Sequence, residues 1–593
     1  MEFQYGYFEG LKQPSLTFSL TTKNFSELDL SILDCWLLEY FEVENLPEIN
    51  ELLIKAPPSG TKIIRMHQFA GRILSIYKLL MEASYLPIVT IGKIVTVKMN
   101  DHESELQLMV PVVSEIVPAV FEDLLKASYR IAFSLAHTSP SPSQATKVFD
   151  QLEEKLFKKF RRQMPDGRAN SFIAGLACKL GYPFEHLGHG IMQIGHGVNA
   201  VILQRSSSLF DSAIGACISA DKIISAQILR RAGFPVPDHA LVNDVASAIK
   251  VANNLGWPVV LKPADCERGE GVTININSKD EIVQAYDLAK KNSSRVLVEK
   301  QVPGYNHRIF VVNGQLVFAN KKYPRMVVGD GVSSVETLIN AFNAKQLRKP
   351  NWKRLILAVL DNEALACLEK EGLTASSVPK PDEKIFLRQI GSDQWGSDKD
   401  TVTDVIHPDN VDLAAQVANL FGLSVCGLDL MSVDITRPWY ETGAVINEVN
   451  FKPFFGGDLK NDRSNPYLNS MILNQGRIPI YLILGDGDLW AEARNLVSAL
   501  SNSTKNVTVT GHGYTELSSG KELHLMCQGL FNRCRALLQN RTLEVLVVVV
   551  DSDEFNQTGL PFDEITNLKL VGNIEESMKN IELMLSRVIS KVS

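Results

Sequence analysis

The chain reads GWPVVLKPADCERGEGV at residues 256–272, and this stretch decides how the rest of the sequence is interpreted. Its apolar run predicts a buried strand that delivers Lys262 at its end, and the following loop contains Gly269 and Gly271. A lysine fixed on a rigid strand and a pliable loop whose amide groups can approach phosphates closely are what a nucleotide clamp requires. The two glycines alone are weaker evidence, because ordinary hairpin turns use glycine just as often.

Two further elements carry polar groups that a nucleotide would use. Lys222 stands at the start of a predicted helix, and Glu299 lies in a predicted strand that leads into the polar segment 304–308. A strand that leaves a sheet in this way can present backbone groups and a carboxylate to the edge of an adenine ring. Each element also has an ordinary explanation, since lysines on helices are usually solvated and amphipathic strands often end in polar turns.

The sharpest polar pattern is the sequence Glu448-Val449-Asn450. Residues two apart in a strand face the same side, so Glu448 and Asn450 are expected to point together while Val449 enters the core. Asp429, on a predicted neighbouring strand, would complete a site rich in oxygen ligands. Magnesium bridged to phosphate oxygens prefers such ligands. Acids on strand surfaces are common, however, so this pattern needs the other elements beside it.

Length and composition are those of a multidomain globular protein. The 593 residues predict three or four domains, and the apolar (45%) and charged (21%) fractions are ordinary. A formal charge of -7 gives no support for a nucleic-acid partner, and no run approaches the roughly 20 apolar residues of a membrane span. No secretory signal is recognised after Met1, and the eight cysteines form no CxxC pair. A cytoplasmic location is therefore expected.

Patterning along the chain predicts an α/β and α+β multidomain protein. An N-terminal α+β module is predicted over residues 1–165, with a hairpin formed by residues 88–97 and 105–113 and a helix over residues 144–163. Residues 166–475 alternate helices and strands, which favours layered α/β or α+β structure over a helical bundle.

A third domain is predicted over residues 476–593. It begins with GRIPIYLILGDGDLW at residues 476–490, which reads as a strand entering a phosphate loop. A working loop of this kind needs a lysine and then a hydroxyl after its last glycine, but Asp488 and Leu489 occupy those places. An aspartate repels a triphosphate and a leucine cannot bind a metal, so this nucleotide site is predicted to be dead. The other main elements predicted here are a helix over residues 523–538 and a buried strand over residues 543–550.

Together, in this order, the motifs resemble the ATP-grasp fold and, more closely, the cyanophycin synthetase family. The resemblance begins near residue 165 and is carried by FPVP at 234–237, PVVLKP at 258–263, GVTINI at 271–276, HRIFVVNG at 307–314, GDG at 329–331, LR at 387–388, IHP at 406–408, GLD at 427–429, ETG at 441–443 and EVN at 448–450. In that family ATP phosphorylates a carboxylate, and an amine then attacks the acyl phosphate. The resemblance therefore implies an ATP-dependent carboxylate-amine ligase with ATP and Mg2+ as cofactors.

The resemblance also implies roles for the residues that match family motifs. Contacts with phosphates and adenosine are implied for Lys222, Lys262, Glu267, Gly269, Gly271, Glu299 and His307. Magnesium ligands would be Asp429, Glu448 and Asn450. The catalytic groups would be Lys262 and Arg388, of which Arg388 would stabilise the acyl-phosphate oxygens. Substrate contacts would come from Arg308 and Ser392.

The last domain is similar to a truncated, degenerate Mur ligase domain. In the longer members of the family, the two halves add aspartate and arginine alternately. One intact site and one dead site resemble instead the type 2 branch, which joins ready-made β-aspartyl-arginine dipeptides into cyanophycin. The last domain is then expected to be a remnant kept for packing or dimerisation.

The sequence departs from the family at residues 389–397, which read QIGSDQWGS where the family has a hydroxyl- and Asn-rich segment ending in paired glycines. That segment shapes the acceptor side, so the amine substrate is left open. Phe454 and the acidic turn at 266–268 also differ from the family pattern. The two Gly-His-Gly segments at 188–190 and 195–197 are expected to be turns rather than metal ligands.

Three functions remain open from the sequence. The leading hypothesis is a cyanophycin-type ligase that acts on small peptides or amino acids and a growing polymer, as a homo-oligomer (dimer or tetramer), with no nucleic-acid or membrane partner. A second is a ligase with a different acceptor, building another nonribosomal peptide. A third is a non-catalytic scaffold in which both nucleotide sites have decayed. The joint presence of two lysines, two acids and Asn450 at the matching positions argues against the third.

Overall fold

The computed structural model describes most of the chain: residues 5–8, 11–23, 30–54, 60–100, 102–114, 116–162, 167–266, 269–392, 395–454, 466–500 and 506–589. These residues form two compact units, which we call the terminal unit (Met1–Arg205 with Met471–Ser593) and the middle unit (Ser206–Ser470). The predicted boundary at residues 165 and 166 falls inside the terminal unit. The three-domain division therefore stays a prediction.

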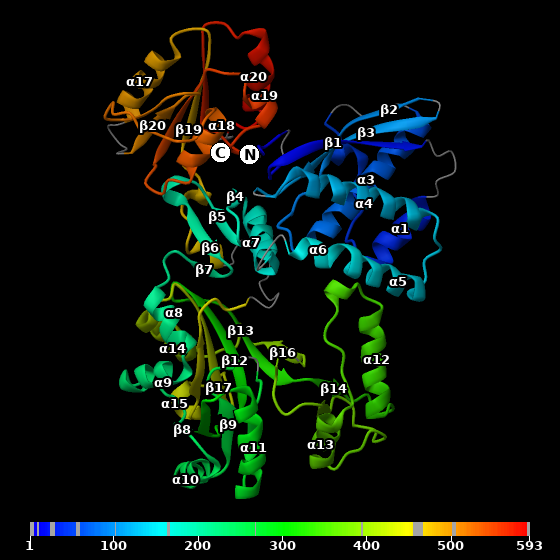
Figure 1. Cartoon of the computed structure of the whole chain (residues 1–593), viewed down its shortest axis with the longest axis vertical. Helices are drawn as coiled ribbons and strands as arrows, with labels where there is room; N and C mark the ends of the chain where they lie inside the picture. The colour runs from blue at the N-terminus through cyan, green and yellow to red at the C-terminus, as the bar shows by residue number, and fades with distance from the viewer. Residues whose placement is uncertain are drawn as a thin grey trace. The chain divides into compact units, whose positions relative to one another are not determined.

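The terminal unit begins with an α+β part (Figure 1, blue to cyan). Its antiparallel sheet has the order β1 (Ser15–Lys23), β3 (Glu103–Pro111), β2 (Lys93–Met99), which confirms the predicted hairpin. The helices are α1 (Leu30–Cys35), α2 (Ile49–Leu52), α3 (Thr61–Ala83), α4 (Pro118–Ala136), α5 (Pro142–Leu152) and α6 (Lys158–Arg161). The helix predicted over residues 144–163 is present as α5 and α6, joined by a π-helical turn at Glu153–Phe157.

The segment that follows hydrogen-bonds the C-terminal part of the same unit. It contains helix α7 (Gly167–Leu180) and the antiparallel strands β4 (Phe184–His186), β5 (Ile191–Ile194) and β6 (Val201–Gln204). Both Gly-His-Gly segments are turns, as predicted, since all four of their glycines have positive φ. In the second turn, the backbone amide of His196 donates to the Gly476 carbonyl at 2.7 Å.

The C-terminal part is a parallel sheet with one antiparallel edge strand (Figure 1, orange to red). The strand order is β21 (Thr515–Leu517), β20 (Val507–Thr510), β22 (Val545–Val550), β19 (Ile480–Gly485), β23 (Asn567–Val571). Helix α17 (Leu489–Leu500) packs against one face, and α18 (Leu530–Leu538) and α20 (Lys579–Ser586) pack against the other. Strand β22 is buried along its whole length, as expected of a central parallel strand, and its run of valines faces both layers.

Two features of this part bear on the sequence-based expectations. The helix predicted over residues 523–538 was wrong at its start, because Gly529 adopts a positive φ and α18 begins only at Leu530. At the altered phosphate loop, Asp488 Oδ1 accepts a hydrogen bond from the Ala491 amide at 3.0 Å. A carboxylate of the chain itself thus caps the amides at which a bound phosphate would stand.

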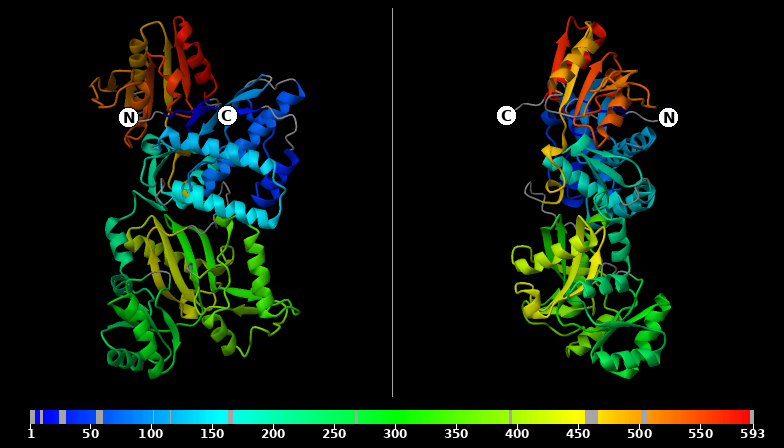
Figure 2. Two further views of the ribbon diagram at one scale, coloured as in Figure 1. Left: turned by 45° about the vertical axis from the view of Figure 1, so that its right-hand side comes forward. Right: turned by 90° about the vertical axis from the view of Figure 1, so that its left-hand side faces the viewer.

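The middle unit has a small antiparallel sheet in the order β10 (Thr273–Ile276), β9 (Val259–Pro263), β11 (Val296–Lys300), β8 (His239–Val242). Helices α10 (Val245–Leu255) and α11 (Lys279–Asn292) pack on one face of it (Figures 1 and 2). Val259, Leu261, Val296 and Val298 enter that core. Because strand side chains alternate, Lys262 and Glu299 stand on the face without helices.

A larger antiparallel sheet of the same unit has the order β16 (Ser397–Thr401), β13 (Gln315–Pro324), β12 (Tyr305–Val312), β17 (Val425–Ser432), β18 (Val445–Asn450). Helix α14 (Pro408–Phe421) covers one face, against a core that includes Ile309, Leu428 and Val449. The helices α8 (Ala213–Ala220), α9 (Lys222–Arg231), α15 (Trp439–Thr442) and α16 (Pro466–Asn469) and the short strand β7 (Ser207–Ser208) complete this part.

Residues 326–386 form an excursion with its own small core. It contains strands β14 (Met326–Val328) and β15 (Lys384–Phe386), which pair antiparallel, and helices α12 (Val335–Leu347) and α13 (Asn362–Lys370). The remaining short helix, α19 (Phe555–Thr558), belongs to the terminal unit. Among the helices described here, none is both long and apolar enough to cross a membrane.

Candidate nucleotide site

Three charged side chains form a line across the larger sheet, on the face that α14 does not cover. Arg308 of β12 pairs in register with Asp429 of β17, which pairs in turn with Glu448 of β18. Directly opposite residues of antiparallel strands share a face, so the three side chains lie together. Arg308 donates to both carboxylate oxygens of Asp429, from Nε at 2.5 Å and from Nη2 at 3.1 Å.

The pKa values of the two carboxylates in this line are shifted in opposite directions. Burial raises the pKa of Asp429, but the charges of Arg308 and Lys322 and hydrogen bonds from Arg308 and Asn306 outweigh it, so the pKa is held below its usual value. The pKa of Glu448 is raised, first by burial and then by the negative charge of Asp429, against which Lys222 and other cations act only in part. Opposed pKa values of this kind are frequent at functional sites.

A β-bulge in β18 adds a side chain to the site. Asp429 pairs with Glu448 but Leu430 pairs with Ile446, so Asn447 is the extra residue. Bulges redirect side chains and are frequent beside active sites. As predicted, Val449 is buried in the core while Glu448 and Asn450 are only partly buried. Within the described residues, the Asn450 Nδ2 atom is buried without a hydrogen-bond partner.

Two lysines reach β18 from the elements that the sequence predicted. Lys262 Nζ lies 2.9 Å from the nearer carboxylate oxygen of Glu299 and 3.4 Å from Asn447 Oδ1. Lys222, at the first position of α9, has its Nζ 3.9 Å from Glu448 Oε1 and donates to the Cys266 carbonyl at 2.5 Å. Lys262 therefore joins the helix-free face of the small sheet to β18 of the larger sheet, and Lys222 joins Glu448 of β18 to the loop after β9.

The loop after β9 is partly described. Glu267 lies outside the described residues, so its predicted role is not addressed by the coordinates. Gly269 and Gly271 have φ angles of +79° and +69°, which favour glycine. A Cβ atom on Gly269 would lie 2.6 Å from Ile390 Cδ1 and 3.9 Å from the Ser392 Cβ. The structure thus brings the loop next to Ser392, which the sequence analysis placed on the substrate side.

Arg388 is held by acids of the excursion rather than by the charged line. Its Nη1 and Nη2 atoms each lie 3.0 Å from an oxygen of Asp361, and its Nε lies 3.5 Å from Glu363. Asp361 also accepts from the Ala364 amide at the start of α13. A catalytic role for Arg388 stays a prediction, and it would require an anionic substrate group to share or replace the Asp361 contact.

His307 and Arg308 are neighbours in β12 and therefore point to opposite faces. His307 pairs with Leu430 and is buried on the side of the α14 core, where burial first, then Lys321, lowers its pKa to about 4. The structure does not bring His307 to the Arg308–Asp429–Glu448 line. Asn306 is instead on that face, where it contributes to the lowered pKa of Asp429.

Sequence reasoning therefore missed Asn306 and Asn447. Strand alternation around Arg308 was a signal for Asn306, because residues 306 and 308 share a face. No sequence signal marked Asn447, since a bulge is decided by the pairing of two strands that are distant in the chain.

A lysine-bearing sheet facing an acid-bearing sheet, in this strand order, defines an ATP-grasp fold. The family described as "Carbamoyl-phosphate synthase L chain, ATP binding domain" matches residues 221–314, which include both lysines and Glu299. Cyanophycin synthetase from Nostoc sp. is 31% identical over 425 residues, which are 69% of this chain and 46% of that protein. The chain belongs to the cyanophycin synthetase family, and it spans about half the length (46%) of this relative.

Other proteins are similar to parts of the chain. Cyanophycin synthetase from Synechocystis sp. is 31% identical over 63% of this chain and 44% of its own length. The glutathione biosynthesis bifunctional protein GshAB from Mannheimia succiniciproducens is 31% identical over 41% of this chain and 33% of its own length. A crystal structure of a bifunctional glutathione synthetase from Pasteurella multocida has a TM-score of 0.36 and 23% identity to this chain, and the match covers 56% of this chain and 49% of that one.

Proposed function

We propose that the chain is an ATP-dependent carboxylate-amine ligase that forms amide bonds through an acyl phosphate. The observation that carries this proposal is the convergence of Lys222, Lys262 and Glu299 with Asp429 and Glu448, from five separate elements of one fold. The substrate that best fits the family is β-aspartyl-arginine, joined into cyanophycin or a related peptide.

In this proposal the two lysines bind the phosphates of ATP. Without nucleotide, the charge of Lys222 faces Glu448 at 3.9 Å and the charge of Lys262 faces Glu299 at 2.9 Å. Phosphate oxygens would compete for the same ammonium groups, and the loop carrying Gly269 would close over them. Phosphoryl transfer is accelerated chiefly by such positioning and charge neutralisation, so no nucleophile from the protein is required.

The donor set on β17 and β18 fits magnesium. Across the part of the chain that is described, no three histidine, cysteine, aspartate or glutamate side chains form a metal site, so Mg2+ would rely on Asp429, Glu448, the Asn450 amide and phosphate oxygens. Magnesium commonly uses one or two carboxylates together with substrate phosphates. Burial and the charge of Asp429 raise the pKa of Glu448, which means that they disfavour its ionised form. A cation bound nearby would favour the ionised form again. When bound, the ion would neutralise charge on the phosphates.

Substrate-dependent ATP hydrolysis tests the proposal directly. Purified protein with Mg2+ is expected to release ADP and phosphate when β-aspartyl-arginine and a cyanophycin primer are present, and to be nearly silent without them. Turnover with another amine would instead support the ligase with a different acceptor. No ATP binding by calorimetry and no turnover over a wide panel of peptides would contradict the ligase and favour the scaffold.

Replacement of Asp488 separates the two nucleotide-like sites. Asp488→Ala removes the carboxylate that caps α17 and is expected to cost about 1 kcal/mol of stability in the C-terminal part, as for other N-cap losses. Turnover measured at a temperature where the variant is fully folded should stay within twofold of the parent. A folded Asp488→Ala protein without turnover would show that the phosphate loop is in use.

We also propose that the protein acts as a homo-oligomer on small peptide or amino-acid substrates and growing polymer, without a nucleic-acid partner. The net charge of -7 supports the last point, since nucleic-acid-binding proteins usually carry a basic surface.

A further inference from the structure

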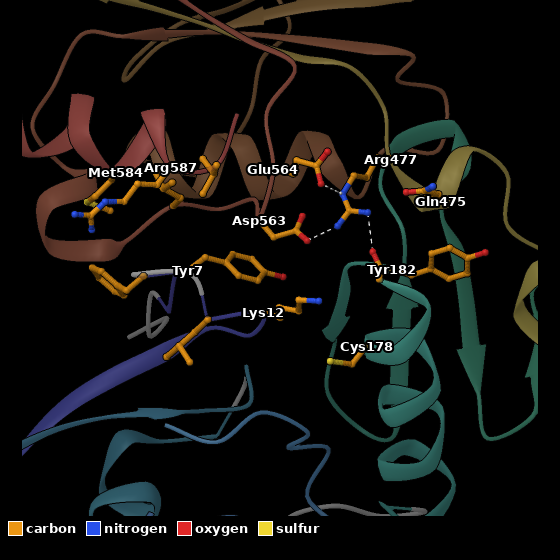
Figure 3. A pocket seen from close by; sticks show the side chains of 15 residues that line it. Tyr7, Lys12, Cys178, Tyr182, Gln475, Arg477, Asp563, Glu564, Met584 and Arg587 are labelled. Carbon is orange, nitrogen blue, oxygen red and sulfur yellow. Dashed lines mark hydrogen bonds and ion pairs between the residues drawn. The ribbon is translucent and has the colours of Figure 1, made fainter. Parts of the chain in front are cut away.

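The terminal unit contains a cavity of about 360 Å³ that lies outside the ATP-grasp unit (Figure 3). Its walls come from the N-terminal segment, from α7 and from the C-terminal part of the chain. Leu11, Leu560, Met584 and Val588 supply apolar surface. Cavities of this size accommodate small ligands, which usually combine an apolar wall with a few polar groups.

Arg477 organises the polar side of this cavity. Its Nη1 donates to the Gly181 carbonyl at 2.7 Å, its Nη2 pairs with Asp563 Oδ2, and its Nε lies 3.4 Å from Glu564 (Figure 3). One guanidinium is therefore shared by two carboxylates. In the described structure, Asp563 Oδ1 is buried without a hydrogen-bond donor. A buried acceptor left unpaired is costly, so a turn of this carboxylate toward a ligand donor in the cavity would be favourable.

Two donors of the chain face the same space. Tyr7 is 9% exposed, and its backbone is fixed by hydrogen bonds in both directions with Leu560, at 2.8 and 3.0 Å. Burial first, then the charge of Asp563, raises the pKa of the Tyr7 hydroxyl well above its usual value, so it stays protonated. Lys12 lines the cavity from an exposed position on the same N-terminal segment (Figure 3).

We propose that this cavity binds a small zwitterion with a basic side chain, an amino acid or a dipeptide. The cationic group would meet Asp563 and Glu564, the carboxylate would meet Lys12 and the Tyr7 hydroxyl, and the aliphatic stem would lie against Leu560 and its apolar neighbours. The lining carries charges of both signs, since Lys12 and Arg587 stand beside Asp563 and Glu564, so a zwitterion matches it better than a simple anion or cation. A purely apolar ligand would leave Asp563 Oδ1 unpaired.

Calorimetry without nucleotide tests this site separately from the ligase. The full chain carrying Glu448→Gln, which removes turnover under the proposed function, is titrated with L-arginine, β-aspartyl-arginine, L-aspartate and inorganic phosphate. Saturable binding is expected for the two basic zwitterions and not for aspartate or phosphate. Tyr7→Phe, which removes only the hydroxyl, should weaken binding about tenfold, and Lys12→Met about threefold because an exposed charge contributes less.

Lys147→Met is the matched control, since Lys147 is an exposed lysine of α5 in the same unit and does not line the cavity. It should bind as the parent does, and all variants should keep the parent melting temperature. Failure of every zwitterion to bind would overturn the proposal, as would binding that Tyr7→Phe and Lys12→Met leave unchanged. If inorganic phosphate bound as tightly as the basic zwitterions, the proposed contact of a cationic group with Asp563 and Glu564 would be wrong. None of these outcomes depends on whether the protein forms amide bonds.

Discussion

Glu448→Gln is expected to lower kcat for ATP-dependent amide formation by about 10²- to 10³-fold, in the range found when one preorganised electrostatic group is removed from an active site. The substitution keeps the shape of the side chain but removes the charge that faces Lys222 and that would hold magnesium. Initial rates of ADP release with a saturating peptide substrate measure the effect. Because the pKa of Glu448 is already raised, neutralising it should not unfold the protein.

Glu441→Gln provides the matched control. Glu441 belongs to α15, between β17 and β18, and it pairs with Arg437 across an exposed helical turn. Its replacement should change kcat by less than twofold. A Glu448→Gln protein that turns over at the parent rate would remove Glu448 from the catalytic site and with it the magnesium assignment.

Arg308→Met is expected to destabilise the middle unit by about 3–5 kcal/mol, because it leaves a buried carboxylate without its partner. The side chains of Arg308 and Asp429 are only 14% and 5% exposed, and the pair is bidentate. For a unit of this size the melting temperature should fall by roughly 10 °C. Differential scanning calorimetry of the full chain, following the transition of the middle unit, measures this change.

The stability lost in the Arg308→Met variant should depend on pH. In the parent protein the pKa of Asp429 is lower in the folded state than in the unfolded state, so its pairing stabilises the fold at neutral pH. That contribution disappears as the pH falls through the lowered pKa. The difference between parent and Arg308→Met should therefore be largest near pH 7 and should shrink below about pH 4, where the carboxyl group becomes protonated.

Two comparisons make this prediction specific. Arg437→Met breaks an exposed ion pair and should cost less than about 1 kcal/mol. Asp429→Asn combined with Arg308→Met should be more stable than Arg308→Met alone, since no buried charge is left over. If the double variant is no better than the single one, packing of the arginine stem rather than charge pairing stabilises this site.

Local patterns in the sequence predicted several elements that the structure confirms. The hairpin of β2 and β3 and the fully buried strand β22 both follow from residues close together in the chain. The loss of the phosphate loop at Asp488 stays a prediction. The predicted helix over residues 523–538 failed where Gly529 imposes a positive φ, because helical spacing alone does not show which backbone conformation a glycine adopts.

The candidate site was likewise predicted only in part from the sequence. Alternation in β18 correctly placed Glu448 with Asn450, since that geometry is local to one strand. His307 was assigned to the adenosine by motif position, and that role stays a prediction. Strand alternation puts His307 on the α14 side and puts Asn306 on the same face as Arg308. The contact between Arg388 and Asp361 was also not predictable, because the two residues are 27 positions apart, with Asp361 inside the excursion and Arg388 just after it.

By itself, the sequence determined which residue types the chain carries in each strand and loop, including the two lysines, the two acids and Asp488 in the altered loop. The burial and alternation of single strands follow from periodicity and side-chain chemistry, which act within a few residues, whereas the ATP-grasp character followed from the resemblance of the motifs to a known family. Only the tertiary structure decided that Asn447 bulges toward Lys262, that Arg308 neutralises Asp429, and that Tyr7, Lys12 and Asp563 surround one cavity. Such contacts depend on strand register and on the packing of distant segments, and neither is written in any single stretch of the chain.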